Sequence, residues 1–564
     1  MVFSYLRSVF KPELFNSLKR YNTRQFGSDL TAGIIVGIVA LPMAIAFAIA
    51  SGVAPEKGIV TAVIAGFIIS ALGGSKVQIG GPTGAFIIIV SGIVEQYGFN
   101  GLIVSTVMAG VILLVMGLAK LGTIIKFVPY PLIVGFTAGI ALTIFSTQMK
   151  DLFGLDIAHV PSGFIEKWAC YASHISTTSL AATILGVLSI AFIAIWQKYI
   201  TRIPGSLVVI IIATAVVAIF NIPVETIGSR FGSLPQNLPP AKIPDMSFEM
   251  IRGLISPAIT IAILGAIESL LSAIVADGMI GSKHNSNTEL VAQGIANIVT
   301  PLFGGIPATG AIARTATNVK NGGRTPIAGM IHALVLLLMM LFLSNLSLLI
   351  PMPVLAAVLV VISYNMSGWK SFRSVLKSPR SDAAVMLVTF FLTIIFDLTV
   401  AIYSGMILAS FLFMRRVSLA ANVDIITDEF EYSEEDDPMA ITKKAVAKGI
   451  EVYEVSGPFF FGVANKFRDE FEKISRHTEI IVLRMRNVPI IDATALNMLE
   501  QFYFDFQKKG IDVVLSGVNP VPLETMQRAG FIDIIGMENV HPDIDKALER
   551  ANYILANSNS VTHK

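Results

Sequence analysis

The sequence predicts an α-helical protein that crosses a membrane many times and ends in a small soluble α/β domain. Hydrophobic residues occupy 54% of its 564 positions and charged residues only 14%, whereas about 25% charged residues is typical of soluble domains. The charged residues are also unevenly spread, because 39 of them fall in the last 144 positions and 41 in the first 420. These two observations exclude a single soluble domain and place a membrane part before residue 420.

The two parts differ in net charge, which is +11 before residue 420 and −9 after it. The single cysteine, Cys170, excludes an intrachain disulfide. No cleavable signal peptide is expected, because the first apolar run is long and no soluble sequence follows it. The predicted divisions are a cytoplasmic N-terminal segment 1–25, a transmembrane domain 26–420, an acidic linker 421–447, a soluble domain 448–556 and a tail 557–564.

Twelve apolar runs have the length that spans a bilayer. They are 30–50, 58–73, 101–119, 131–147, 180–196, 206–220, 255–276, 288–303, 326–345, 352–366, 382–396 and 398–414. Two shorter stretches, 82–91 and 309–319, lie beside Pro, Thr and Gly and are expected to be half-helices. The sequence therefore predicts fourteen transmembrane elements.

The distribution of Lys and Arg predicts the orientation of these elements. An even number of elements puts both termini on one side, and basic residues should then follow the even-numbered elements if that side is cytoplasmic. Lys120, Lys198 and Arg415 follow even-numbered elements, whereas the odd connections 95–100 and 344–349 contain no Lys or Arg. We expect a multi-pass protein of the plasma (inner) membrane with both termini in the cytoplasm.

Two short motifs recur in the second half of the membrane part. Pro82-Thr-Gly-Ala returns as Pro307-Ala-Thr-Gly-Ala, and Val128-Pro-Tyr-Pro returns as Ile350-Pro-Met-Pro, at offsets of 226 and 222 residues. Each unit would contain seven elements, so the second must be inserted upside down relative to the first. This is the inverted-repeat plan of secondary transporters.

The starts of the two half-helices are predicted to form an anion site near the middle of the membrane. A helix that begins there leaves its first N–H groups unpaired and carries partial positive charge, which an anion satisfies. The expected substrate-binding residues are Thr83, Gly84, Ala85, Thr309, Gly310, Ala311 and Arg314. The alternative is that Gly and Pro serve close helix packing at these positions.

Two ionisable residues lie inside predicted membrane elements, where charges are costly and usually functional. Arg314 is expected to add positive charge behind the anion site, to pair with Glu268, or to do both. Glu268 is the predicted coupling residue, because a sodium ion or a proton bound there would offset its repulsion of the anion. Ser272, four residues later on the same helix face, and carbonyl groups around Gly310 would complete a sodium site. A purely structural salt bridge is the remaining alternative.

These motifs resemble the SulP (sulfate permease) family of anion transporters. The resemblance rests on Asp29-Leu-Thr-Ala-Gly33, Ala40-Leu-Pro-Met-Ala44, Gln78-Ile-Gly-Gly-Pro-Thr-Gly84 and Gly322-Gly-Arg-Thr-Pro326, followed by a soluble tail. It implies a core domain of elements 1–4 and 8–11, a gate domain of elements 5–7 and 12–14, elevator-like motion and a homodimer. Met43 makes the chain most similar to the sodium-coupled bicarbonate branch, although that branch has Asp where this chain has Glu268.

The soluble tail has the pattern of a small α/β domain. Strands are predicted at 450–456, 480–485 and 512–516, and helices at 465–475, 493–508 and 523–529. Ile491-Asp-Ala-Thr-Ala-Leu496 resembles the signature of the STAS domain, a cytoplasmic module. Asp492 is expected to cap the following helix, and Thr494 is an alternative regulatory position, since Ala493 occupies the site of the Ser that is commonly phosphorylated. The acidic stretch 428–437 is expected to be a solvated linker.

The sequence therefore predicts a secondary active transporter of a small inorganic oxyanion, with bicarbonate ahead of sulfate. A proton-coupled dicarboxylate transporter and an anion channel or exchanger regulated through the tail are the alternatives. An enzyme is not expected, because no nucleophile-and-base pair, metal cluster or phosphate-binding loop is apparent. The expected partners are the anion, the bilayer, a second copy of the chain and a cytoplasmic regulator of the STAS domain. Neither a nucleic-acid partner nor a cofactor other than a sodium ion is expected.

Overall fold

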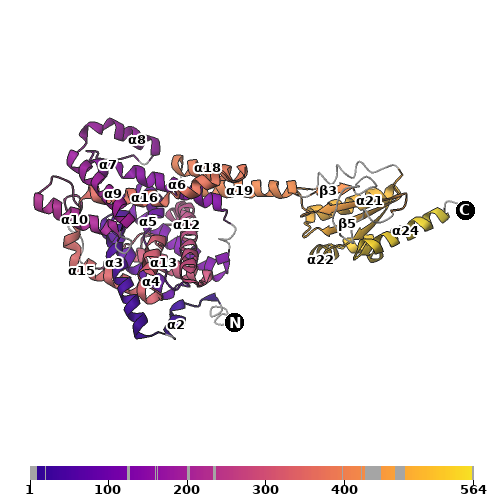
Figure 1. Cartoon of the computed structure of the whole chain (residues 1–564), viewed down its shortest axis with the longest axis horizontal. Coiled ribbons are helices and arrows are strands. Elements are labelled where there is room, and N and C mark those ends of the chain that lie inside the picture. The colour runs from indigo at the N-terminus through magenta and orange to yellow at the C-terminus, as the bar shows by residue number, and fades with distance from the viewer. Residues whose placement is uncertain are drawn as a thin grey trace. The chain divides into compact units, whose positions relative to one another are not determined.

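The computed structural model describes residues 9–19, 21–123, 128–158, 160–161, 163–199, 204–232, 237–396, 398–420, 422–425, 446–463 and 477–561. The chain divides into two compact units, one up to Ala409 and one from Ser410 onward (Figure 1). The boundary falls inside helix α19 (Leu398–Ala420), somewhat before the predicted boundary at residue 420. The first unit is built from helices, and the second contains a five-stranded sheet.

Each of the twelve predicted apolar runs corresponds to a helix to within a few residues at most ends. The last run corresponds to α19. The other eleven correspond to α3 (Thr23–Ala50), α4 (Pro55–Leu72), α5 (Ile87–Leu118), α6 (Tyr130–Thr147), α9 (Leu180–Tyr199), α10 (Gly205–Phe220), α12 (Phe248–Ile280), α13 (Ser286–Leu302), α15 (Pro326–Ser347), α16 (Met352–Met366) and α18 (Arg380–Ile395). In the part of the chain that the structure describes, nine helices are long and apolar enough to cross a membrane. The α-helical polytopic fold is therefore confirmed.

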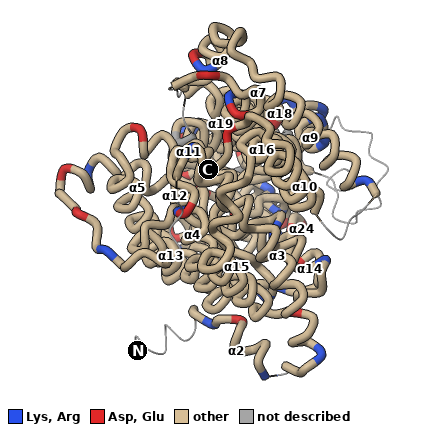
Figure 2. The backbone as a smooth tube through the Cα atoms, turned by 90° about the vertical axis from the view of Figure 1, so that its left-hand side faces the viewer, with Lys and Arg blue, Asp and Glu red and all other residues tan. Residues whose placement is uncertain are grey.

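Several short helices were not predicted, because they are too short to produce a hydropathy signal. They are α2 (Glu13–Leu18), α7 (Met149–Phe153), α8 (Phe164–Ser173), α11 (Ile227–Phe231) and α17 (Trp369–Leu376). Charged residues gather at some of them, and Figure 2 shows coloured segments near α8 and α7 at one end of the first unit and near α2 at the other. This placement keeps charge away from the apolar middle of the spans.

The helices of the first unit pack in two groups, which correspond to the predicted core and gate except that α19, the last predicted gate element, is divided between the first and second units. The core group contains α3, α4, α5, α12, α13, α15 and the short helix α14 (Ile312–Lys320). The gate group contains α6, α7, α9, α10, α16, α17 and α18. Glycines allow close helix crossings within the core: a Cβ at Gly294 would lie 2.6 Å from the backbone nitrogen of Leu114, so α5 and α13 meet backbone to backbone.

Two motifs that lie far apart in the sequence meet at the start of α3. The buried carboxylate of Asp29 accepts hydrogen bonds from the backbone N–H of Arg324 at 2.8 Å and from the hydroxyl of Thr325 at 2.6 Å. Tyr21 also donates to Asp29, and burial together with this carboxylate raises the pKa of Tyr21 to about 12. The two motifs are thus held together by one side chain, which joins α3 to the loop before α15.

We expect Asp29→Ala to lower the free energy of unfolding by about 3 kcal/mol, because it leaves several donors at this contact without an acceptor. Asp29→Asn keeps one carbonyl oxygen and should cost roughly half as much. Thermal unfolding of the detergent-purified variants measures both effects. Equal midpoints for wild type and Asp29→Ala would contradict the assignment.

The second unit is a small α/β domain. Its strands are β3 (Asn422–Ile425), β4 (Ile450–Ser456), β5 (Ile480–Asn487), β6 (Asp512–Ser516) and β7 (Val540–His541), in that order across the sheet. Strand β3 runs antiparallel to β4, and the later strands are parallel to one another. The three predicted strands are confirmed, whereas β3 and β7 were not predicted, because four and two residues give no readable alternation.

Helices cover both faces of this sheet. Helices α21 (Ala493–Lys508), α22 (Pro520–Arg528) and α23 (Phe531–Ile535) share one hydrophobic core with alternate residues of β4, β5 and β6. The unpredicted helix α24 (Ile544–Val561) covers the other face and continues past residue 556, where the domain was predicted to end. The predicted helix 465–475 and the acidic stretch 428–437 lie outside the described residues.

Candidate functional site

The first predicted half-helix begins with a short turn of 3₁₀ helix, η1 (Gly84–Phe86), which continues directly into α5. It is longer than predicted, because helical geometry passes Ser91 and is interrupted only at Gly98, where φ is 69°. Gly98 therefore separates this segment from the rest of α5, as a residue without Cβ readily does.

The start of this helix presents free hydrogen-bond donors. No described residue accepts a hydrogen bond from the backbone N–H of Gly84 or Ala85. The hydroxyl of Thr83 is also buried without a partner among the described residues. Buried donors without an acceptor are costly, so this arrangement is typical of a site that an anion completes.

The same helix start faces the gate group. A Cβ at Gly84 would lie 3.1 Å from Sδ of Met366 in α16, 3.3 Å from Cδ1 of Ile144 in α6 and 3.6 Å from Cε1 of Phe47 in α3. The free donors therefore lie where the core and gate groups meet. A ligand held there would contact both groups.

The second predicted half-helix differs from the first. Its helix, α14, begins at Ile312, three residues later than predicted, because Thr309 and Gly310 form strand β2 instead. This strand pairs antiparallel with β1 (Gly80–Gly81), so the segments that precede the two half-helices lie side by side. Their antiparallel pairing agrees with the predicted inverted repeat.

The polar groups before the second half-helix already form hydrogen bonds with other parts of the protein. The hydroxyl of Thr309 donates to the carbonyl of Gly265 at 3.0 Å and lies 2.6 Å from Oγ of Ser269. The N–H of Gly310 donates to the same Ser269 oxygen at 3.1 Å, and the N–H of Ala311 donates to the carbonyl of Ile79 at 2.8 Å. These three residues, expected to face the anion, therefore pack against α12 and β1 in this structure.

Arg314 links the two half-helices. Its side chain is 2% exposed and donates from Nη2 to the carbonyl of Pro82, while Nη1 has no partner among the described residues. No ion pair joins Arg314 to Glu268 in the described structure. The guanidinium thus contacts Pro82, two residues before Gly84, and a role of Arg314 in anion binding stays a prediction.

Glu268 lies in the middle of α12, only 8% exposed, and has no hydrogen bond or ion pair among the described residues. Ser272, one turn later, is fully buried, and its hydroxyl lies 3.2 Å from the hydroxyl of Thr315 in α14. Hydroxyl oxygens of two helices therefore meet one turn from an unpaired carboxyl group.

Three residues of this region were missed by the sequence analysis: Gln78, Ser269 and Thr315. Gln78 fills the space beside Gly310, where a Cβ would come within 1.7 Å of Nε2 of Gln78. Ser269 and Thr315 each follow directly after a residue that was singled out, Glu268 and Arg314. Their position next to rare intramembrane charges was the available signal.

In the second unit, Asp492 caps α21 as predicted. Its carboxylate accepts hydrogen bonds from the N–H of Ala495 at 2.8 Å and of Phe461 at 3.1 Å. Thr494 is exposed on the first turn of the helix. A regulatory role of either residue stays a prediction.

Two protein-family models match the chain. The sulfate permease family matches residues 26–389, and the STAS domain matches residues 442–547. A putative sulfate transporter of Bacillus subtilis, YvdB, is 40% identical over 523 residues, which are 92% of this chain and 97% of the relative. The bicarbonate transporter BicA of Picosynechococcus is 30% identical over 496 residues, 85% of this chain and 86% of the relative.

Two solved structures of membrane transporters share the fold of this chain. The transmembrane domain of a cyanobacterial BicA superposes with a TM-score of 0.62 at 29% identity and covers 68% of this chain and 98% of that chain. The murine Solute Carrier 26 family member A9 anion transporter, in an inward-facing state, shares the fold with a TM-score of 0.87 at 18% identity, covering 98% of this chain and 95% of that chain. With its helical unit, its free helix start and its α/β domain, the chain belongs to the sulfate permease family of membrane transporters and carries a C-terminal STAS domain.

Proposed function

We propose that this chain is a secondary active transporter that carries bicarbonate across the plasma membrane. The observation that carries the proposal is the free start of the first half-helix, where the N–H groups of Gly84 and Ala85 and the hydroxyl of Thr83 have no described acceptor. Three neighbouring donors without a described acceptor and the nearby guanidinium of Arg314 fit a small oxyanion, whose oxygens accept several hydrogen bonds at once.

Elevator-type alternating access is part of this proposal. The donors belong to the core group, whereas Ile144 and Met366, which face them, belong to the gate group. Sliding of the core past the gate would carry the bound anion from one side of the membrane to the other while its hydrogen bonds stay intact. We further propose that both termini are cytoplasmic and that two copies associate.

Sulfate is the second candidate substrate. The 40% identical relative is described as a putative sulfate transporter, whereas the relatives described as bicarbonate transporters are 30% and 29% identical. Met43 instead of Gln or Glu favours the bicarbonate branch. Both anions are oxyanions that the same backbone donors can bind, so the choice depends on transport measurements.

The test is uptake of ¹⁴C-labelled bicarbonate and ³⁵S-labelled sulfate into proteoliposomes, each with and without an inward sodium or proton gradient. We expect a cation gradient to raise the internal concentration of labelled bicarbonate above its equilibrium value. Unlabelled substrate should compete with this uptake. Sulfate uptake without bicarbonate uptake would establish the second candidate. Passive flux of many anions, unaffected by either gradient, would contradict a coupled carrier and favour a channel.

A further inference from the structure

A cavity of about 640 Å³ lies between the two helix groups at the α8 end of the first unit. One wall is formed by the core residues Ala46 and Ile87 and the opposite wall by the gate residues Thr143 and Leu355. Ile87 follows Ala85 by two residues. The cavity therefore reaches the helix that begins with the free donors.

Two polar side chains of α8 line this cavity without a partner. Lys167 and Tyr171 are one turn apart on the same helix face, and they are 5% and 4% exposed. No described residue forms a hydrogen bond or an ion pair with the ammonium group of Lys167, and the hydroxyl of Tyr171 is buried without a described acceptor. A buried lysine that forms neither a hydrogen bond nor an ion pair is rare in proteins.

The protonation of these two groups suits a site that donates hydrogen bonds. Burial and the nearby carboxylate of Asp151 raise the pKa of Tyr171, so its hydroxyl stays a donor at neutral pH. Burial lowers the pKa of Lys167, and the carboxylate of Glu95, on the core side of the cavity, acts in the opposite direction. An anion in the cavity would stabilise the charged form of Lys167 in the same way.

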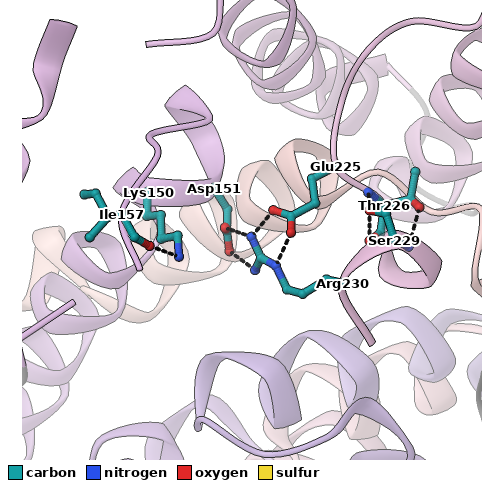
Figure 3. A network of polar contacts seen from close by, with 7 residues as sticks. All are labelled: Lys150, Asp151, Ile157, Glu225, Thr226, Ser229 and Arg230. Atoms are coloured by element: carbon teal, nitrogen blue, oxygen red, sulfur yellow. Dashed lines mark hydrogen bonds and ion pairs between the residues drawn. The ribbon is translucent and has the colours of Figure 1, made fainter. Parts of the chain in front are cut away.

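The other cation of this cavity is already neutralised (Figure 3). Arg230 forms two hydrogen bonds with Asp151, at 2.6 and 3.2 Å, and also pairs with both carboxylate oxygens of Glu225. Hydrogen bonding from Arg230 lowers the pKa of Glu225, so the carboxylate stays ionised.

The helix that carries Arg230 is fixed by a capping box between Thr226 and Ser229, which Figure 3 also shows. Arg230 is therefore held in place by its own helix and by two carboxylates. Among the described residues that line the cavity, Lys167 is the cation that remains uncommitted.

We propose that Lys167 and Tyr171 bind a small oxyanion in this cavity, at a second anion site on the path between the α8 end and Gly84. Lys167 supplies the charge and Tyr171 a hydroxyl donor, while Glu95 competes with the anion for the ammonium group. This inference rests on the proposed oxyanion transport and adds an entry site to it. With both termini cytoplasmic, the site faces the outside of the cell.

The test compares half-saturation of bicarbonate and sulfate uptake from the α8 side with that from the opposite side. An impermeant maleimide that labels Cys170, in α8 and the single cysteine of the chain, reports which transporters expose that side. From the α8 side, Lys167→Gln should raise the half-saturation concentration about tenfold and Tyr171→Phe about threefold, as expected for one charged and one neutral hydrogen bond. From the opposite side, both effects should be less than twofold.

Glu95→Gln distinguishes a binding site from a structural ion pair. If Lys167 binds the anion, removing the competing carboxylate should lower the half-saturation concentration on the α8 side. If Glu95 and Lys167 instead pair with each other to hold the fold, both single variants should be impaired and the double variant restored, which would overturn the proposal. Lys198→Gln, at the end of α9 beside Tyr199, is the matched control and should leave uptake unchanged.

Failure of the site and failure of the proposed function give different results. If the wild type takes up the anions and the half-saturation concentration of Lys167→Gln is unchanged, the second anion site is refuted and the proposed function stands. If wild-type protein takes up neither anion, the proposed function fails. Calorimetric titration of the full-length detergent-purified protein with sulfate then tests the site by itself, and equal binding by wild type and Lys167→Gln refutes it.

Discussion

Replacing Gly84 by Val is expected to reduce bicarbonate and sulfate uptake at least 100-fold while the protein stays folded. The Cβ of any side chain at this position would already lie 3.1 Å from Met366 and 3.3 Å from Ile144. The two valine methyl groups would then occupy the space in front of the free N–H groups. An anion could not approach these donors, and a site that relies on backbone donors has no side chain that replaces them.

The matched control is Gly278→Val in the last turns of α12, where a Cβ would meet no atom within 4 Å. Both variants replace a helical glycine by the same β-branched residue, so they share any effect of that change on helix propensity. Uptake and binding of the labelled anions are measured at equal amounts of monodisperse protein. Uptake within threefold of wild type in Gly84→Val would place the anion site elsewhere.

Gly310→Val is not an equivalent experiment, although the sequence treats the two glycines as repeats of each other. A Cβ at Gly310 would lie 1.7 Å from Nε2 of Gln78 and 3.2 Å from Cα of Ser269. The substitution would push β2 away from α12 before any ligand is involved. We expect Gly310→Val to lower the unfolding temperature, whereas Gly84→Val should not.

Hydropathy was sufficient to predict the spanning helices, because the bilayer imposes one length on every span and excludes charge from it. The two helix starts were harder to predict. Both motifs contain Thr-Gly-Ala, yet the first starts a helix at Gly84 and the second forms strand β2 and begins its helix only at Ile312. The difference arises from tertiary contacts, since Ser269 accepts the N–H of Gly310, and no local pattern encodes that contact.

The cavity residues could not be predicted from the sequence either. Lys167 and Tyr171 lie in a short helix that connects two spans, and a lysine in such a connection is usually exposed to water and has no further role. Their burial depends on α8 folding back over the cavity between the helix groups, which a single sequence does not reveal. The contact of Asp29 with Arg324 and Thr325 was equally hidden, because it joins two motifs that lie almost 300 residues apart in the sequence.

Replacing Glu268 by Gln is expected to abolish uptake above equilibrium while anion exchange continues. Glu268 is buried and has no partner among the described residues, so its charge must be neutralised by a bound cation or a proton before an anion can bind nearby. Glutamine has the same shape and no charge. The anion would bind the variant without a cation, and the coupling free energy between the two ligands would fall to zero.

The measurement separates coupling from binding in the same vesicles. A tenfold inward sodium or proton gradient should no longer raise the internal anion concentration above the external one in Glu268→Gln, whereas exchange of labelled for unlabelled anion should stay within about threefold of wild type. Glu268→Asp retains the carboxylate and should retain the gradient response with weaker cation affinity.

Thr315→Val distinguishes a sodium ion from a proton as the coupled cation. A sodium ion needs the hydroxyl oxygens of Ser272 and Thr315, which lie 3.2 Å apart. Because the Thr315 hydroxyl also accepts the N–H of Ile79, loss of gradient-driven uptake in Thr315→Val indicates sodium only where anion exchange is retained. Retention of gradient-driven uptake indicates a proton, which Glu268 alone can carry. Full gradient-driven accumulation in Glu268→Gln would remove Glu268 from the coupling mechanism.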